Sequence, residues 1–77
     1  MEALITISLK EGIGDPEGAN TKKALNLLGY DHVKEVRALK AFKITFEGSE
    51  DYDREIDEMC RKLLTNPVIH DYKVDLL

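Results

Sequence analysis

The sequence is poor in the residues that reinforce very small proteins. Its 77 residues include a single cysteine, Cys60, so no disulfide can form within the chain, and a lone thiol favours a reducing compartment. A chain of this size buries only about 60% of the surface that its unfolded state exposes, so its own core is marginal. Small domains that lack disulfides and metals are usually stabilised by association. We therefore expect an oligomer.

Two further absences limit the setting and the partners. No apolar run approaches the ~20 residues that span a bilayer, and the chain opens on alternating strand residues rather than on a signal-peptide pattern. The 15 acidic residues outnumber the 11 lysines and arginines, for a formal net charge of −4. An acidic chain without a basic stripe argues against nucleic acid as a partner. We expect a cytoplasmic protein that binds neither nucleic acid nor membrane.

The longest patterned stretch lies in the middle of the chain, at residues 33–47. Apolar and polar side chains alternate from Val36 to Phe46, which predicts a strand with one buried face. About fifteen extended residues reach roughly 50 Å, whereas a folded chain of this size is only ~30 Å across. The strand must bend near Leu39 and Lys40, where the alternation breaks, or project from its own subunit. A projecting strand would leave an unpaired edge that a second chain has to cover.

Two helices are predicted from their ends. Asp15 is a good N-cap and Pro16 suits the first helical position, so a helix should begin there and run to about Leu28. Its apolar stripe is Thr21, Ala24, Leu25 and Leu28, and Gly29 suits the left-handed conformation that ends a helix. Ser49 can cap a second helix, which carries acidic residues first and basic residues last, as the helix dipole favours. Pro67 stops this helix, because the residue before a proline avoids helical angles.

Two more strands complete the predicted fold. Residues 3–10 and 68–76 both alternate in the manner of half-buried strands. The order β-α-β-α-β with short connections describes one domain over residues 1–77. Two helices on one face of a small sheet give an α+β two-layer sandwich. We expect the long central strand to extend this sheet across a dimer.

No catalytic, cofactor-binding or metal-binding residue is predicted. The glycine-rich turn at residues 12–18 has the wrong spacing for a phosphate loop, and its two acidic residues would repel an anion. Cys60 could pair with a histidine as a nucleophile, but it lies on the apolar stripe of its helix and should pack in the core. Residues 51–57 resemble a calcium loop only until Ile56, which stands where such a loop needs glycine. One cysteine and two separated histidines are a poor zinc set.

Arg37 and Lys40 are harder to explain, because a long basic residue that interrupts an apolar face is costly unless it is paired or reaches a boundary. One interpretation is a bulge or an edge with both side chains in water. The other is that the pair meets an acidic partner, a neighbouring subunit or an anionic ligand. The residues alone thus describe a small acidic oligomeric module without an active site of its own.

Four segments, in order and without large gaps, carry a resemblance to a known family. They are Lys10-x-Gly12-Ile13-x-Asp15-Pro16-x-Gly18, Leu28-Gly29-Tyr30, Val33-x-x-Val36-Arg37-x-x-Lys40, and Met59-Cys60-x-Lys62-Leu63-Leu64-x-Asn66-Pro67-Val68-Ile69-x-Asp71-Tyr72. Through them the chain resembles the PurS family, the small subunits of the three-part phosphoribosylformylglycinamidine synthase of purine biosynthesis. The departures from the family pattern are Glu11, Gly14, Leu39 and His70, where proline, leucine, glycine and glutamate are usual. The glycine usual at position 39 would ease a bend there.

The resemblance implies a non-catalytic subunit that an ATP-dependent carbon–nitrogen ligase requires. In that family the enzyme converts formylglycinamide ribonucleotide, glutamine and ATP to formylglycinamidine ribonucleotide. A glutaminase subunit, PurQ, releases ammonia, and a synthetase subunit, PurL, uses ATP and magnesium. PurS bridges the two as a homodimer and supports ammonia transfer. The chain itself is then expected to bind no cofactor, since ATP and magnesium belong to the complex.

The candidate contacts with partners or with other copies follow from the resemblance and from the two basic residues. They are Arg37, Lys40, Phe42, Asn66, Pro67, Val68, Ile69, Asp71 and Tyr72. The free protein should be a homodimer or a dimer of dimers. Two other classes stay open: a stand-alone dimeric regulatory module that binds a small ligand at its interface, and a small thiol enzyme that uses Cys60.

Overall fold

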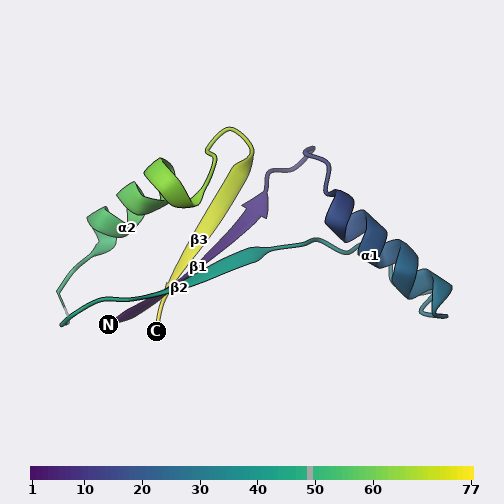
Figure 1. Ribbon diagram of the computed structural model, residues 1–77, viewed down its shortest axis with the longest axis horizontal. Coiled ribbons are helices and arrows are strands. Elements are labelled where there is room, and N and C mark those ends of the chain that lie inside the picture. The colour runs from purple at the N-terminus through teal and green to yellow at the C-terminus, as the bar shows by residue number, and fades with distance from the viewer. Residues whose placement is uncertain (49) are drawn as a thin grey trace.

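The structure is a computed structural model that describes residues 1–48 and 50–77, and it contains a three-stranded antiparallel sheet and two helices (Figure 1). This confirms the predicted α+β class and the β-α-β-α-β order. The second helix continues into a wider, π-helical turn, η1. The elements are β1 (Glu2–Leu9), α1 (Pro16–Leu27), β2 (Lys40–Thr45), α2 (Asp53–Met59), η1 (Cys60–Leu64) and β3 (His70–Leu76).

Strand β1 lies in the middle of the sheet, between β2 and β3. Ile5 pairs with Phe42 of β2 on one side and with Val74 of β3 on the other. Side chains alternate along a strand, so Ala3, Ile5 and Ile7 face the same side, and all three are at most 4% exposed. The predicted alternation of the first strand is confirmed.

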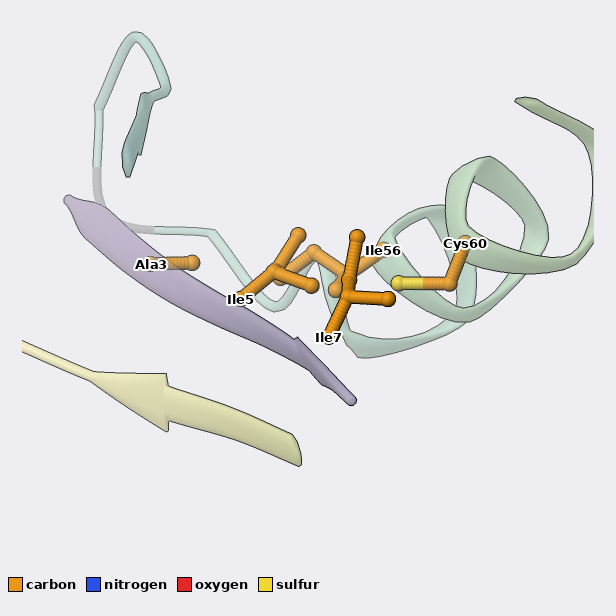
Figure 2. Close-up of a cluster of buried hydrophobic side chains, with 5 residues drawn as sticks. All are labelled: Ala3, Ile5, Ile7, Ile56 and Cys60. Carbon is orange, nitrogen blue, oxygen red and sulfur yellow. The ribbon is translucent and has the colours of Figure 1, made fainter. Parts of the chain in front are cut away.

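The core lies between this face of β1 and the second helix. Figure 2 shows Ile56 and Cys60 reaching from the helix toward Ile5 and Ile7. Both helical residues are at most 1% exposed. Burial raises the pKa of the Cys60 thiol, with a smaller effect of the nearby Asp57 charge. The prediction that Cys60 packs in the core is confirmed, and its environment disfavours the reactive thiolate.

The second helix begins later than the sequence predicts, at Asp53. The expected cap, Ser49, lies outside the described residues. Asp53 and Glu55 stand in the first turn, and the basic residues come at the other end, in η1. There the Nε atom of Arg61 lies 2.9 Å from a carboxylate oxygen of Asp57, one turn earlier. The predicted order of charges along the helix is confirmed, and it suits the helix dipole.

Residues 10–39, which we call the arm, project from the end of the sheet and contain α1 (Figure 1). The molecule measures 48 × 25 × 14 Å, and its radius of gyration is 15.9 Å, against about 11 Å for a compact chain of this length. The predicted strand over residues 33–47 is thus partly wrong: only Lys40–Thr45 is strand within this chain. The reason is that β1 ends at Leu9, so the residues before Ala38 have no strand of their own chain beside them.

The helices differ in what they cover. α2 lies over the sheet, whereas α1 stands beyond the sheet's end (Figure 1). The apolar stripe predicted for α1 is open to solvent within one chain, since Leu28 is 74% exposed and Leu25 only half-buried. The sequence predicts two helices over one face of the sheet, but within one chain only α2 covers that face, because the arm carries α1 beyond the end of the sheet.

We expect Ile56→Ala to lower the free energy of unfolding by about 2–5 kcal/mol, because it opens a cavity against β1. Leu63→Ala is the matched control, since Leu63 lies two turns further along and is 82% exposed. The control should change stability by no more than about 0.5 kcal/mol. Urea unfolding at one protein concentration measures both. Equal losses would mean that the core has been misidentified.

Candidate interaction surface

The carboxylate of Asp15 holds the base of the arm together. One oxygen accepts a hydrogen bond of 2.8 Å from the backbone N–H of Gly18, which caps α1 as predicted. The other accepts a bond of 2.8 Å from the N–H of Ala38, 23 residues further along the chain. These bonds, led by the one from Gly18, and the charge of Arg37 lower the pKa of Asp15. One side chain thus joins the start of the helix to the returning segment.

Gly18 allows the two segments of the arm to lie this close. A Cβ atom at this position would stand 2.2 Å from the carbonyl oxygen of Val36 and 2.7 Å from a carboxylate oxygen of Asp15. Real side chains do not reach such distances, so a larger residue would push the returning segment away from the helix. Gly18 is buried for this reason.

The far end of the arm is closed by Asn26 and Gly29. The side-chain amide of Asn26 donates to the carbonyl oxygens of Tyr30, at 2.9 Å, and Val33, at 3.4 Å. Gly29 has φ of +99°, the left-handed conformation predicted to end the helix. The helix and the returning segment are therefore tied at both ends, which makes the arm one unit.

A hollow of about 170 Å³ lies where the arm meets the sheet. Its lining includes the end of β1, Glu17 from α1, Lys40 from β2, Leu64 from η1 and His70 from β3. Lys40 is exposed, and its ammonium lies 5.0 Å from the centre of the Phe42 ring, a cation–π distance. The odd position of Lys40 on the apolar side is thus explained: it stands at the end of β2, over an aromatic ring.

The predicted contact segment, residues 66–72, forms the turn into β3 and part of that strand. Asn66 organises the turn, because its carbonyl oxygen accepts from the N–H groups of Ile69 and His70. The exposed positions include Pro67 and Val68, and the latter is 79% exposed. The carbonyl of Ile69 accepts a bond of 2.8 Å from the N–H of Lys10, which places the turn beside the start of the arm.

Tyr72 connects two elements as well as belonging to this segment. Its hydroxyl donates to Asp57 of α2, and that carboxylate also accepts from Arg61. The bond from Tyr72 is the main reason that the pKa of Asp57 is lowered, and it raises the pKa of Tyr72. Tyr72 and Phe42 are both half-buried against the core, so each has a structural role whether or not it meets a partner. Asp71 is exposed.

The structure therefore brings some of the candidate residues together and separates one. Lys40 and the 66–72 segment lie at the same end of the sheet, where the arm leaves it. Arg37 lies on the arm, where its Nε atom is 2.9 Å from a carboxylate oxygen of Glu35, and its side chain is 42% exposed. It borders a second hollow of about 240 Å³, which also includes Asp15 and Lys22. Arg37 and the 66–72 segment thus face different surroundings.

Sequence reasoning missed how much apolar surface the arm and the sheet leave open. Leu27 is 80% exposed and Leu39 59% exposed, and both lie on the arm. On the last strand, Leu76 is 57% exposed. The alternation and the helical stripe revealed which side of each element is apolar. They did not reveal that, among the described residues, no element covers these side chains.

Within residues 1–48 and 50–77, no group of three or more His, Cys, Asp or Glu side chains is placed to hold a metal ion. The helices in that part of the chain are all too short or too polar to cross a membrane. What the described surface does offer is strand edges, exposed apolar side chains and charged residues. These are the elements from which protein–protein interfaces are built.

The comparisons agree over the whole length of the chain. The family model of PurS, phosphoribosylformylglycinamidine (FGAM) synthase, matches residues 2–77. The PurS subunit of phosphoribosylformylglycinamidine synthase from Archaeoglobus fulgidus is 53% identical over 76 residues, which is 96% of this chain and 95% of the relative. The crystal structure of Methanocaldococcus jannaschii PurS, a subunit of formylglycinamide ribonucleotide amidotransferase, has a TM-score of 0.87 at 47% identity, over 96% of this chain and 92% of that one.

A second solved structure, PurLQS from Thermotoga maritima, contains a chain of the same fold. It has a TM-score of 0.79 at 24% identity, and the match covers 99% of this chain and 95% of that one. At this identity the likeness is one of fold. The fold is therefore not peculiar to this sequence.

The lowered pKa of Asp15 has a consequence for stability. A carboxylate whose folded-state pKa lies below its unfolded value stabilises the fold above the unfolded pKa, and it loses this effect as the pH falls through the folded pKa. Asp15→Asn can accept only one of the two N–H bonds, so we expect a lower melting temperature at about pH 7. The difference from wild type should shrink as the pH falls below about 4, because aspartate in the unfolded chain is protonated there, and Asp15 of the folded protein, with its lowered pKa, follows at a lower pH.

Thermal unfolding at a fixed protein concentration measures this effect. Glu11→Gln is the matched control, since Glu11 is an exposed acidic residue of the same turn. It should change the melting temperature little at any pH. A deficit of Asp15→Asn that stays constant down to about pH 3 would contradict the electrostatic account, because the ordinary pKa of an aspartate is about 3.9.

Proposed function

The chain belongs to the PurS family, the small subunits of phosphoribosylformylglycinamidine synthase in purine biosynthesis, and we propose that it serves there as a non-catalytic bridge between a synthetase and a glutaminase subunit. The arm is the observation that carries this proposal. It is an internally tied unit that projects from the sheet and leaves its apolar side open. A subunit that joins other chains needs such a surface, whereas a self-contained enzyme does not.

The partners we propose are PurL and PurQ. The PurLQS structure from Thermotoga maritima names all three subunits in one assembly, and its chain of the same fold supports the same arrangement here. In this proposal PurQ releases ammonia from glutamine, and PurL uses ATP and magnesium to activate the amide oxygen of formylglycinamide ribonucleotide. Ammonia then displaces phosphate to give the amidine. This chain would touch none of the reacting atoms.

A second copy of the chain is the other partner we propose. The N–H of Phe46 donates to the carbonyl of Met1, and antiparallel bonds alternate along a strand. The backbone groups of Ala41, Lys43 and Thr45 therefore point away from β1 and form a free edge. This edge continues into residues 33–39, so a second copy could extend the sheet there. In the same contact, the exposed apolar stripe of α1 would pack against the second copy.

The bridge would act through proximity. Ammonia released by one subunit reaches the other only if the two active sites are held in register and the path between them excludes water. A rigid dimer fixes that register, because the tied ends of each arm leave it little freedom. The contribution of this chain is therefore to the transfer of ammonia and not to either reaction.

One observation favours a second candidate function. The hollow at the base of the arm is lined by Glu17, Lys40 and His70, which could hold a small polar molecule in a stand-alone regulatory module. Such a ligand would raise the melting temperature of the isolated protein by linkage. A thiol enzyme is disfavoured, because burial raises the pKa of the Cys60 thiol.

We expect glutamine-dependent synthesis of formylglycinamidine ribonucleotide by matched PurL and PurQ to require this protein. Turnover of PurL with added ammonia should need it far less, because free ammonia does not depend on transfer between subunits. Steady-state assays with glutamine or an ammonium salt, each with and without the chain, measure both. Glutamine-dependent turnover that is unchanged without the chain would overturn the bridging role and leave the ligand-binding module as the better hypothesis.

Charge reversal at Arg37 tests the arm as a partner contact. Arg37→Glu should weaken assembly with PurL and PurQ by at least about tenfold, since a like-charge contact costs several kcal/mol. The melting temperature of the free protein should stay close to wild type. Arg54→Glu is the matched control, because the Arg54 side chain is 93% exposed on α2, away from the arm. If Arg37→Glu unfolds the free protein, Arg37 is structural and the proposed contact is wrong.

A further inference from the structure

We propose that the outer edge of β3 is a second self-association surface, on which another copy of the chain pairs antiparallel about a two-fold axis at Val74. This contact is separate from the β2 edge. It would join dimers into larger assemblies, and it does not depend on PurL or PurQ.

The hydrogen bonds of the sheet define which backbone groups this edge presents. The N–H of Leu77 donates to the carbonyl of Glu2, and the N–H of Lys10 donates to the carbonyl of Ile69. Because antiparallel bonds alternate, the odd-numbered residues of β3 face β1. The even-numbered residues, from His70 to Leu76, point their N–H and C=O groups outward. Along the seven residues of the strand, the edge therefore presents outward donors and acceptors at Tyr72, Val74 and Leu76, whereas the N–H of His70 already donates to the carbonyl of Asn66.

The edge lacks most features that usually block strand addition. The register from His70 to Leu76 runs without a bulge, and the only nearby proline precedes the strand. One lysine, Lys73, stands on the strand, but its ammonium lies 3.7 Å from a carboxylate oxygen of Asp75. A strand edge of this length without a bulge or a proline is a template for pairing.

The sequence of β3 is complementary to itself in one register. A two-fold at Val74 sets Val74 opposite Val74 of the second copy and Tyr72 opposite its Leu76. These are the residues whose backbone groups point outward, so every pair is hydrogen-bonded. On the other face, Lys73 meets Asp75 of the second copy twice. Apolar pairs on one face and opposite charges on the other are the pairs that stabilise a sheet.

Neighbouring registers are poorer. A two-fold at Lys73 would set Lys73 against itself and Asp71 against Asp75, and like charges opposite each other are destabilising. A two-fold at Tyr72 keeps an opposite-charge pair, Asp71 with Lys73, but it sets His70 opposite Val74. Leu76 then lies beyond the first residue of the second copy's strand and has no partner in it. The register at Val74 also covers exposed apolar surface, since Val74 is 36% and Leu76 57% exposed.

The first test uses the free protein and a backbone change. In Val74→Pro the missing N–H is one that faces outward, so pairing with β1 survives. Sedimentation should show that the average mass of wild type rises with concentration beyond the dimer. Val74→Pro should stop at the dimer, with contact between dimers weakened at least about tenfold. If Val74→Pro stops at the monomer, the contact at the β3 edge stands and the proposed dimer at the β2 edge is wrong. If the average mass of Val74→Pro rises with concentration as that of wild type does, the contact at the β3 edge is wrong.

The second test uses paired charges and separates association from folding. Lys73→Asp leaves two acidic residues on the edge, and Asp75→Lys leaves two basic ones. Each variant alone should stay at the dimer, because the two-fold sets like charges together. Their equimolar mixture should recover the larger assembly, since each acidic edge then meets a basic one. If the mixture fails to associate, the proposed register is wrong. If Val74→Pro loses binding to PurL while its mass is unchanged from wild type, the β3 edge is a contact with PurL and not with a second copy.

Discussion

The small size of the core is the constraint on which the rest of this structure depends. Within the described residues, five buried side chains between β1 and the second helix form the hydrophobic core, and partly buried side chains such as Phe42, Ile44 and Leu64 pack against it. The elements furthest from this core, above all the arm, have little apolar cover of their own. Exposed leucines on α1 and on β3, and a free edge on each side of the sheet, are consequences of the same shortage. The features that make a single copy marginal are the features that suit it to assembly.

The arm is held together in a different way. Its cohesion comes from polar contacts to the backbone, with Asp15 at one end and Asn26 at the other. Hydrogen bonds fix direction more closely than apolar contacts do, so the arm keeps its shape without a core. Gly18 adds the close approach that such contacts require. The chain thus combines a sheet stabilised by burial with a projection stabilised by capping.

Local patterns predicted the local structure well. The alternation of β1, the cap at Asp15, the end at Gly29 and the apolar position of Cys60 on its helix can all be predicted from neighbours within one element, and the structure has them. The predictions that failed depend on contacts with residues far away in the sequence. Residues 33–39 carry a strand pattern, but pairing needs a second strand, and β1 ends before it can supply one. The stripe of α1 marks an apolar side without identifying what covers it. For the candidate contacts, the 66–72 segment and Lys40 meet at one end of the sheet, whereas Arg37 does not join them.

The place where the arm leaves and rejoins the sheet has a topological consequence. β1 and β2 are antiparallel neighbours, so a tight turn from Leu9 to Lys40 could connect them as a plain hairpin. The chain instead inserts residues 10–39 between them. Closing a loop of this length rather than one of a few residues costs about 2 kcal/mol in chain entropy. For the sheet alone this is a pure loss. The insertion is therefore a separable module, and it is the part of the gene in which a designer could lengthen, shorten or replace a connector while the sheet below it stays unchanged.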